Sequence, residues 1–163
     1  MKLKILTISC NIIKKKIIFS CMKALVSAHS GLRWIVLLAL LFSIVVSLIN
    51  RDSNEISKKQ KLIYLAALIS SHIQLLIGLI LYFLSSKVVF SKETMGNTIT
   101  RFFTVEHVLG MVLAIALVTI GYSKSKKAKN HKKILLFYTL ALVVIFLSIP
   151  WPFREALGVA NWA

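Results

Sequence analysis

Apolar residues in this chain are gathered into four long blocks, and short polar connectors separate them. The blocks cover residues 24–49, 62–85, 102–122 and 134–151. Each approaches or exceeds the roughly 20 residues that a helix needs to cross a bilayer. Because the blocks are apolar on every face, and because a backbone in lipid must satisfy its own hydrogen bonds, each is predicted to be a membrane-spanning helix. A membrane β-barrel would instead alternate polar and apolar residues in stretches of about ten.

Composition supports the same conclusion. Hydrophobic residues make up 58% of the 163-residue chain, whereas soluble domains are about 45–50% apolar. A water-soluble protein of this length could not bury so much apolar surface. The predicted fold is therefore all-α, an integral membrane four-helix bundle with up-and-down topology.

The positive charges lie in the connectors. The net charge is +16, which can indicate nucleic-acid binding. Lysine and arginine are concentrated at 51–61 and 124–133, whereas the second connector holds fewer, namely Lys87, Lys92 and Arg101. This asymmetry follows the positive-inside rule, so connectors one and three are predicted to face the cytoplasm, with both termini outside. No phosphate-binding loop or base-stacking platform accompanies the charge, so no nucleic-acid partner is expected.

The first 21 residues do not fit this topology, because their five lysines would lie on the outer side. A signal segment, a lipoprotein leader acylated at Cys10 or Cys21, and translated upstream sequence are three explanations. We favour the third, with Met22 as the true start, because residues with AT-rich codons dominate the segment. The predicted organisation is then 1–21 as an upstream extension or disordered leader, 22–153 as the transmembrane bundle and 154–163 as a short interfacial tail.

A few polar side chains lie within the apolar blocks, where an ionisable group is costly and usually marks a functional site. They are His29 and Arg33 in the first block, His72 and Gln74 in the second, and Glu106 and His107 in the third. His131, among lysines at the margin of the fourth block, is interpreted as a solvated connector residue. No catalytic Ser–His–Asp set or carboxylate pair is visible, so an independent hydrolase is not expected.

Three histidines within apolar blocks suggest a metal site, because neutral imidazole can ligate a metal or relay protons. A structural zinc site usually takes four ligands, often with cysteine, and both cysteines of this chain lie before Met22. Haem iron needs only one or two axial side chains, and helix bundles hold such sites between facing helices. The donor set therefore favours haem over zinc.

The neighbours of the histidines suit either a cofactor or close helix packing. One helical face of the third block carries His107, Gly110, Met111 and Ala114. Small residues there leave room for a flat macrocycle or for another helix. Arg33 is four residues after His29, where it could neutralise a haem propionate or pair with Glu106.

Helix depth does not decide which two histidines share a metal. Measured from the outer helix ends, His29 and His107 lie roughly 10 and 9 Å deep, and His72 roughly 21 Å. Measured from the cytoplasmic ends, His107 falls between the other two. Both the His29–His107 and the His72–His107 pairs stay open.

The small and polar residues of the second block are expected to face the interior, namely Ser70, Ser71, His72, Gln74 and Gly78.

Several strings resemble those of small four-helix bacterial membrane proteins commonly labelled cytochrome b-like. The strings are HSGLRW (29–34), SHIQLLIGLILYF (71–83), RFFTVEH (101–107) and PWPF (150–153). The chain is more remotely similar to the copper-resistance D type. The resemblance covers nearly all of 22–153. It implies a haem b-type electron carrier of the bacterial inner membrane, with His29, His72 and His107 as the matching histidines. Two haems would need two pairs of histidines. Only three matching histidines are present, which implies one haem rather than two.

Two function classes follow. The first is a redox module in which one haem b passes electrons between the quinone pool and a partner, with Arg33 and Arg101 offsetting propionate charge and Gln74 or Glu106 handling protons. The second is a non-redox membrane subunit or assembly factor whose polar residues only fasten helices. Both are compatible with a homo-oligomer in the bilayer. A transporter is a weaker third, because four helices need an oligomer to enclose most pathways.

Overall fold

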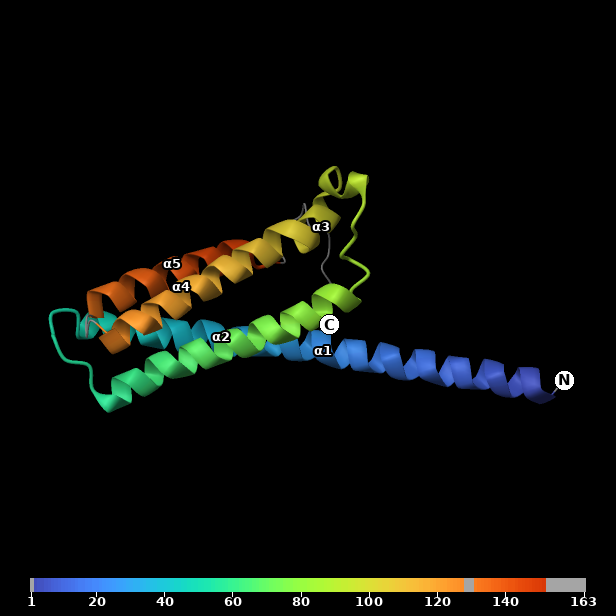
Figure 1. Cartoon of the computed structure of the whole chain (residues 1–163), viewed down its shortest axis with the longest axis horizontal. Coiled ribbons are helices and arrows are strands. Elements are labelled where there is room, and N and C mark those ends of the chain that lie inside the picture. Colours follow the sequence, from blue (N-terminus) through green and yellow to red (C-terminus); the bar gives the residue numbers. More distant parts are fainter. Residues whose placement is uncertain (1, 128–130, 152–163) are drawn as a thin grey trace.

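The computed structural model describes residues 2–127 and 131–151, and every regular element in these ranges is helical (Figure 1). The longer helices are α1 (Lys2–Ile49), α2 (Lys58–Leu84), α4 (His107–Lys127) and α5 (His131–Ser148). Three short turns precede α4, namely the 3₁₀ turn η1 (Lys92–Met95), α3 (Thr98–Arg101) and the π-helical turn η2 (Phe102–Glu106). The predicted interfacial tail 154–163 lies outside the described residues.

Four helical stretches are long and apolar enough to cross a membrane. They are Lys16–Ile49, Lys58–Leu84, Thr98–Lys126 and His131–Ser148. Their outward faces carry large apolar side chains, such as Leu38 and Leu62, each 65% exposed. A soluble monomer rarely exposes apolar surface on this scale. The prediction of an all-α, four-span membrane protein is confirmed.

The four helices form a ring in which sequence neighbours are also spatial neighbours. Both α1 and α4 pack against α2 and α5, so α1 and α4 lie diagonally across the bundle. This is the up-and-down arrangement. Fully buried side chains from all four helices fill the centre, among them Leu40, Tyr64, Val118 and Tyr138. The α1–α2 and α4–α5 pairs diverge toward the end that carries connector 85–97 (Figure 1).

The helix boundaries have local causes. Ser57 caps α2, because its side chain accepts from the Gln60 amide while the Gln60 side chain accepts from the Ser57 amide; this capping box satisfies two amides that would otherwise lack partners. Helix α5 ends at Ser148, two residues before Pro150, because the residue preceding a proline is driven away from helical geometry.

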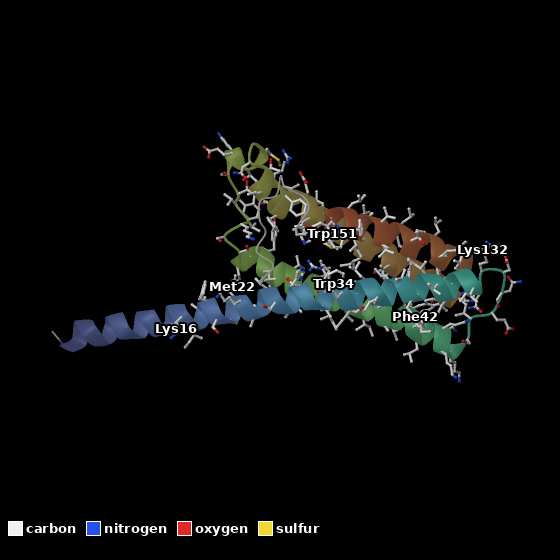
Figure 2. The ribbon with its side chains drawn as sticks, turned by 180° about the vertical axis from the view of Figure 1, so that it is seen from behind. Lys16, Met22, Trp34, Phe42, Lys132 and Trp151 are labelled. Carbon is white, nitrogen blue, oxygen red and sulfur yellow. The ribbon has the colours of Figure 1, made fainter. Side chains whose placement is uncertain are left out.

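The N-terminal segment continues α1 beyond the bundle. Helix α1 has 48 residues and is therefore about 72 Å long, more than twice the thickness of a hydrocarbon core. Figure 2 shows Lys132 at one end of the bundle, Met22 at the other, and Lys16 beyond Met22 on the projecting part of α1. Residues 2–21 are thus helical, while Met22 as the translation start stays a prediction.

Candidate functional site

A cavity lies inside the bundle where the helix pairs diverge. Its volume is about 240 Å³. Residues of all four helices line it, and its boundary runs from Ile115 in the interior to Met22, Ser85 and Lys87 near the diverging end. Most of the lining is apolar, and the polar members include His29, Arg33, Ser71, Gln74 and His107. Four of the predicted cofactor residues, His29, Arg33, Gln74 and His107, therefore meet in one cavity.

The imidazoles of His29 and His107 face each other in this cavity. Their ring centroids are 6.5 Å apart, and the ring planes are inclined by 72°. His29 comes from α1 and His107 from α4, the diagonal pair. The two rings therefore reach toward the bundle axis from opposite sides, and the structure brings together the His29–His107 pair of the two pairs left open by sequence.

His107 is held in one orientation by the backbone of α5. Its Nδ1 lies 2.7 Å from the Ser148 carbonyl oxygen. A carbonyl only accepts, so Nδ1 carries the proton and donates it, which leaves Nε2 of the neutral ring as a free lone pair. A Cβ at Gly110 would clash with the Ser148 side chain. Glycine at that position therefore permits the close approach of α4 and α5 that places the Ser148 carbonyl.

A π-helical turn sets the direction of His107. The turn η2 covers Phe102–Glu106, and the His107 amide donates to the Phe102 carbonyl at its end. Turns of this kind insert one residue into a helix and are frequent at functional sites. The string RFFTVEH carried no recognisable signal for the turn, so this feature was missed from sequence.

Around His29, buried polar atoms lack partners within the described residues. Gln74 donates through Nε2 to the His29 carbonyl oxygen at 2.9 Å. The Gln74 Oε1 and the His29 Nδ1 are buried and have no hydrogen-bond partner. A Cβ at Gly78 would lie 3.0 Å from Cε1 of His29, so the glycine makes room for the ring. Buried polar atoms without partners are rare, and they indicate a place for water or a ligand.

The basic residues near the cavity differ in position. Arg33 lines the cavity, and its guanidinium carbon lies 5.4 Å from the Trp34 ring centroid. Lys87 also lines it and was not predicted. Arg101 forms an ion pair with Glu106 (Nε–Oε1, 2.7 Å) at the surface and is not among the described residues that line the cavity. The predicted pairing of Arg101 with a cofactor propionate is therefore not matched by its position.

The expectation that His72 faces the interior is wrong. His72 is exposed on the outer face of α2, while its neighbour Ser71 is buried. Successive residues on a helix are turned by about 100°, so Ser71, Gln74 and Gly78 can share the cavity face while His72 cannot. The Nδ1 of His72 lies 2.8 Å from the Leu68 carbonyl oxygen of its own helix. His72 and His107 are thus not brought together within one chain.

The interpretation of His131 as a solvated residue is also wrong. His131 is fully buried, with its Nε2 3.1 Å from the Glu55 carbonyl oxygen and its Nδ1 3.0 Å from the Tyr64 hydroxyl. Since Nε2 must donate to the carbonyl, Tyr64 donates to Nδ1, and Ser47 donates to the Tyr64 oxygen at 3.1 Å. The Tyr138 hydroxyl donates to the Tyr64 carbonyl at 3.0 Å. These residues form a second polar cluster, which we call the His131 network.

Surface charges join the same elements. Asp52, in the connector after α1, lies 3.1 Å from Lys132 Nζ and 3.3 Å from Arg51 Nε. Hydrogen bonds from Lys132 and then Arg51 lower the pKa of the Asp52 carboxyl. Exposed pairs of this kind contribute little to stability, whereas the hydrogen bond from the fully buried His131 to the Glu55 carbonyl also joins this connector to α5.

Comparison with known proteins adds no assignment. No protein-family model, no curated protein and no solved structure was found to match the chain. Within the described residues, no group of three or more His, Cys, Asp or Glu side chains is arranged to hold a metal ion. The site is therefore interpreted from the two facing imidazoles and the groups beside them.

Proposed function

We propose that this chain is a haem b-binding membrane protein that transfers electrons, with His29 and His107 as the axial ligands of one haem. The observation that supports this is the 6.5 Å separation of the two ring centroids within one cavity. Two imidazoles on opposite sides of one metal have centroids roughly 6 Å apart, from metal–nitrogen bonds of about 2 Å and about 1 Å from nitrogen to ring centre. The ring planes are free to be mutually inclined in such an arrangement.

The groups beside the histidines support the same function. Metal-binding histidines usually donate their second N–H to a carbonyl or carboxylate, as His107 does to Ser148. Arg33 and Lys87 bring positive charge to the cavity, and no Asp or Glu occurs among its described lining residues. This charge suits the two carboxylates of a haem, and arginine in particular can bind a carboxylate through two parallel hydrogen bonds.

The size of the cavity sets one requirement. A volume of about 240 Å³ is slightly below the roughly 300–1,000 Å³ that is usual for small-molecule sites. Accommodating a macrocycle therefore requires lining side chains to turn aside. Met111 lies on the cavity wall, and its unbranched, flexible thioether chain can adapt in this way.

Held by His29 and His107, a haem would supply one-electron transfer. The role that follows is electron transfer between the quinone pool and a partner protein. By the positive-inside rule, the end of the bundle with Lys58, Lys59, Lys132 and Lys133 would face the cytoplasm of a bacterial inner membrane. The cavity, which extends toward the other end, would then lie in the outer half of the bilayer.

The test is the absorbance spectrum of protein produced with ample haem, oxidised and reduced. We expect the sharp reduced bands of a low-spin haem in the wild type and their loss in His107→Ala and His29→Ala. His72→Ala, which alters an exposed residue, is the matched control and should keep them. If the wild type binds no haem, the proposal fails. If the bands survive both cavity substitutions, the ligand assignment fails while haem binding stands.

The alternative is a non-redox membrane subunit, and it has one supporting observation. Several polar side chains bond to the backbone of another element, such as Gln74 to the His29 carbonyl and the Tyr82 hydroxyl to the Thr104 carbonyl at 3.0 Å. Bonds of this kind fasten helices without a cofactor. Wild-type protein that folds fully and never binds haem would favour this function.

A further inference from the structure

The two histidines of the cavity differ in how their second ring nitrogen is held. The Nδ1 of His107 donates to the Ser148 carbonyl, whereas the Nδ1 of His29 is buried and has no partner among the described residues. A metal-binding histidine usually donates its second N–H to a carbonyl, a carboxylate or a water, which fixes the ring and raises the basicity of the ligating nitrogen. His29 therefore needs an acceptor of the kind that His107 already has.

The side chain of Gln74 offers that acceptor. Its Nε2 donates to the His29 carbonyl at 2.9 Å, and because a carbonyl only accepts, this bond fixes which end of the amide is nitrogen. The other end, Oε1, is the one buried side-chain oxygen without a hydrogen-bond partner in the described part of the chain. The unpartnered nitrogen and the unpartnered oxygen thus belong to two residues that are already joined by a hydrogen bond.

A second, smaller cavity lies beside both groups. Its volume is about 40 Å³, and His29, Gln74 and Gly78 are among the residues that line it. A Cβ at Gly78 would lie 3.6 Å from Nδ1 and 4.0 Å from Nε2 of His29, so the Nδ1 side of the ring is turned toward α2, the helix that also carries Gln74. A water molecule needs roughly 10–15 Å³ of such space and at least two polar partners. The smaller cavity provides both.

We propose that Gln74 orients His29 for metal binding through one water in the smaller cavity. The water accepts from Nδ1–H of His29 and donates to Oε1 of Gln74, so both buried atoms are satisfied. With its proton on Nδ1, the neutral ring keeps the lone pair of Nε2, as the ring of His107 does. The metal in this inference rests on the proposed function, whereas the tautomer of His29 is a property of the chain without any metal.

The tautomer is measured by nitrogen NMR of haem-free protein in nanodiscs, labelled at the histidine ring nitrogens. The signals of His29 are assigned by their loss in His29→Ala. In the wild type we expect the proton on Nδ1 and magnetisation transfer to it from water. Gln74→Leu should remove this preference, while Gln74→Glu, which keeps an acceptor oxygen, should retain it. Ser70→Ala is the control on α2, because the Ser70 hydroxyl bonds to the Ala67 carbonyl of its own helix at 3.1 Å.

Three results would overturn the proposal. The first is a wild-type proton on Nε2, which needs no variant to fold. The second is the wild-type tautomer in Gln74→Leu. The third is loss of the tautomer in both Gln74→Leu and Gln74→Glu, because the donated bond to the His29 carbonyl would then be the cause. A tautomer that depends on Gln74 but shows no transfer from water would overturn the bridging water.

Loading with haem gives a second readout. Loss of a hydrogen-bond partner of a metal ligand typically costs 10–100-fold in affinity, so Gln74→Leu should weaken haem binding by roughly that factor, with Gln74→Glu closer to the wild type. The reduction potential should rise in Gln74→Leu, because a less basic imidazole stabilises oxidised iron less. Unchanged affinity and potential in Gln74→Leu would contradict the role of Gln74. If the wild type binds no haem, the proposed function fails, and the nitrogen spectra still decide the role of Gln74.

Discussion

Replacing Tyr64 with phenylalanine should destabilise the bundle through the His131 network. The substitution keeps the ring and removes one hydroxyl. That hydroxyl accepts from Ser47 at 3.1 Å and donates to His131 Nδ1 at 3.0 Å. Ser47 and His131 are both fully buried, so each loses its partner where water cannot replace it. The change therefore leaves two buried polar groups unsatisfied and creates no large cavity.

The magnitude follows from these two lost bonds. An unsatisfied buried polar group costs about 1–3 kcal/mol in soluble proteins, while interhelical bonds in membranes average about 0.6 and reach about 1.7 kcal/mol. The membrane values apply, because the unfolded helices in lipid also find partners. Two bonds then predict a loss of roughly 1–3 kcal/mol for Tyr64→Phe. Ser47→Ala should cost about 0.6–1.7 kcal/mol, because it removes one bond and the Tyr64–His131 bond survives.

The assay is reversible unfolding in mixed micelles for both single variants and the double variant. The double variant should be no less stable than Tyr64→Phe alone, because Ser47 no longer has a hydroxyl to satisfy. Tyr138→Phe is the control, since it removes the bond to the Tyr64 carbonyl and leaves the linked bonds of Ser47, Tyr64 and His131 intact. Wild-type stability in Tyr64→Phe, or simple addition of the Ser47 and Tyr64 effects, would refute the linked network.

Two further predictions concern the cavity and the topology. Gly78→Ala places a methyl 3.0 Å from His29 Cε1, so it should reduce haem retention in the proposed site. Gly31→Ala, whose methyl meets nothing within 4 Å, should leave haem retention unchanged, and equal effects in spectra of the two variants would argue against His29 as a ligand. Single cysteines at Lys59 and Lys92 should react with impermeant reagents from opposite faces of the membrane, and reaction from the same face would reject the four-span topology.

The sequence by itself determined the number of membrane spans and most of their approximate limits, although it did not predict that α1 begins at Lys2. A bilayer requires about 20 apolar residues per span and a self-satisfied backbone, so four apolar blocks predict four helices whatever their packing. Local signals placed some ends as well. A proline at 150 disfavours helical geometry at the residue before it, and α5 ends at Ser148. The short connectors predicted neighbours that are adjacent in space, as the up-and-down ring confirms.

The depth of a residue could also be read from sequence, but depth left both the His29–His107 and the His72–His107 pairs open. What depth cannot supply is the rotation of each helix about its own axis. His72 and Ser71 are neighbours in sequence, yet only Ser71 lines the cavity. In a soluble bundle the apolar stripe marks the buried face. In lipid the outer face is as apolar as the core, so the stripe is lost and polarity alone predicted the wrong direction for His72.

Tertiary structure alone decided the His131 network. The network joins Ser47, Tyr64 and His131 from three helices, and the Glu55 carbonyl from a connector. No spacing within one helix encodes such a contact, because it depends on which helices are adjacent and at what height. His131 therefore resembled a solvated residue among lysines, although the packing of the helices around it excludes water and leaves it fully buried.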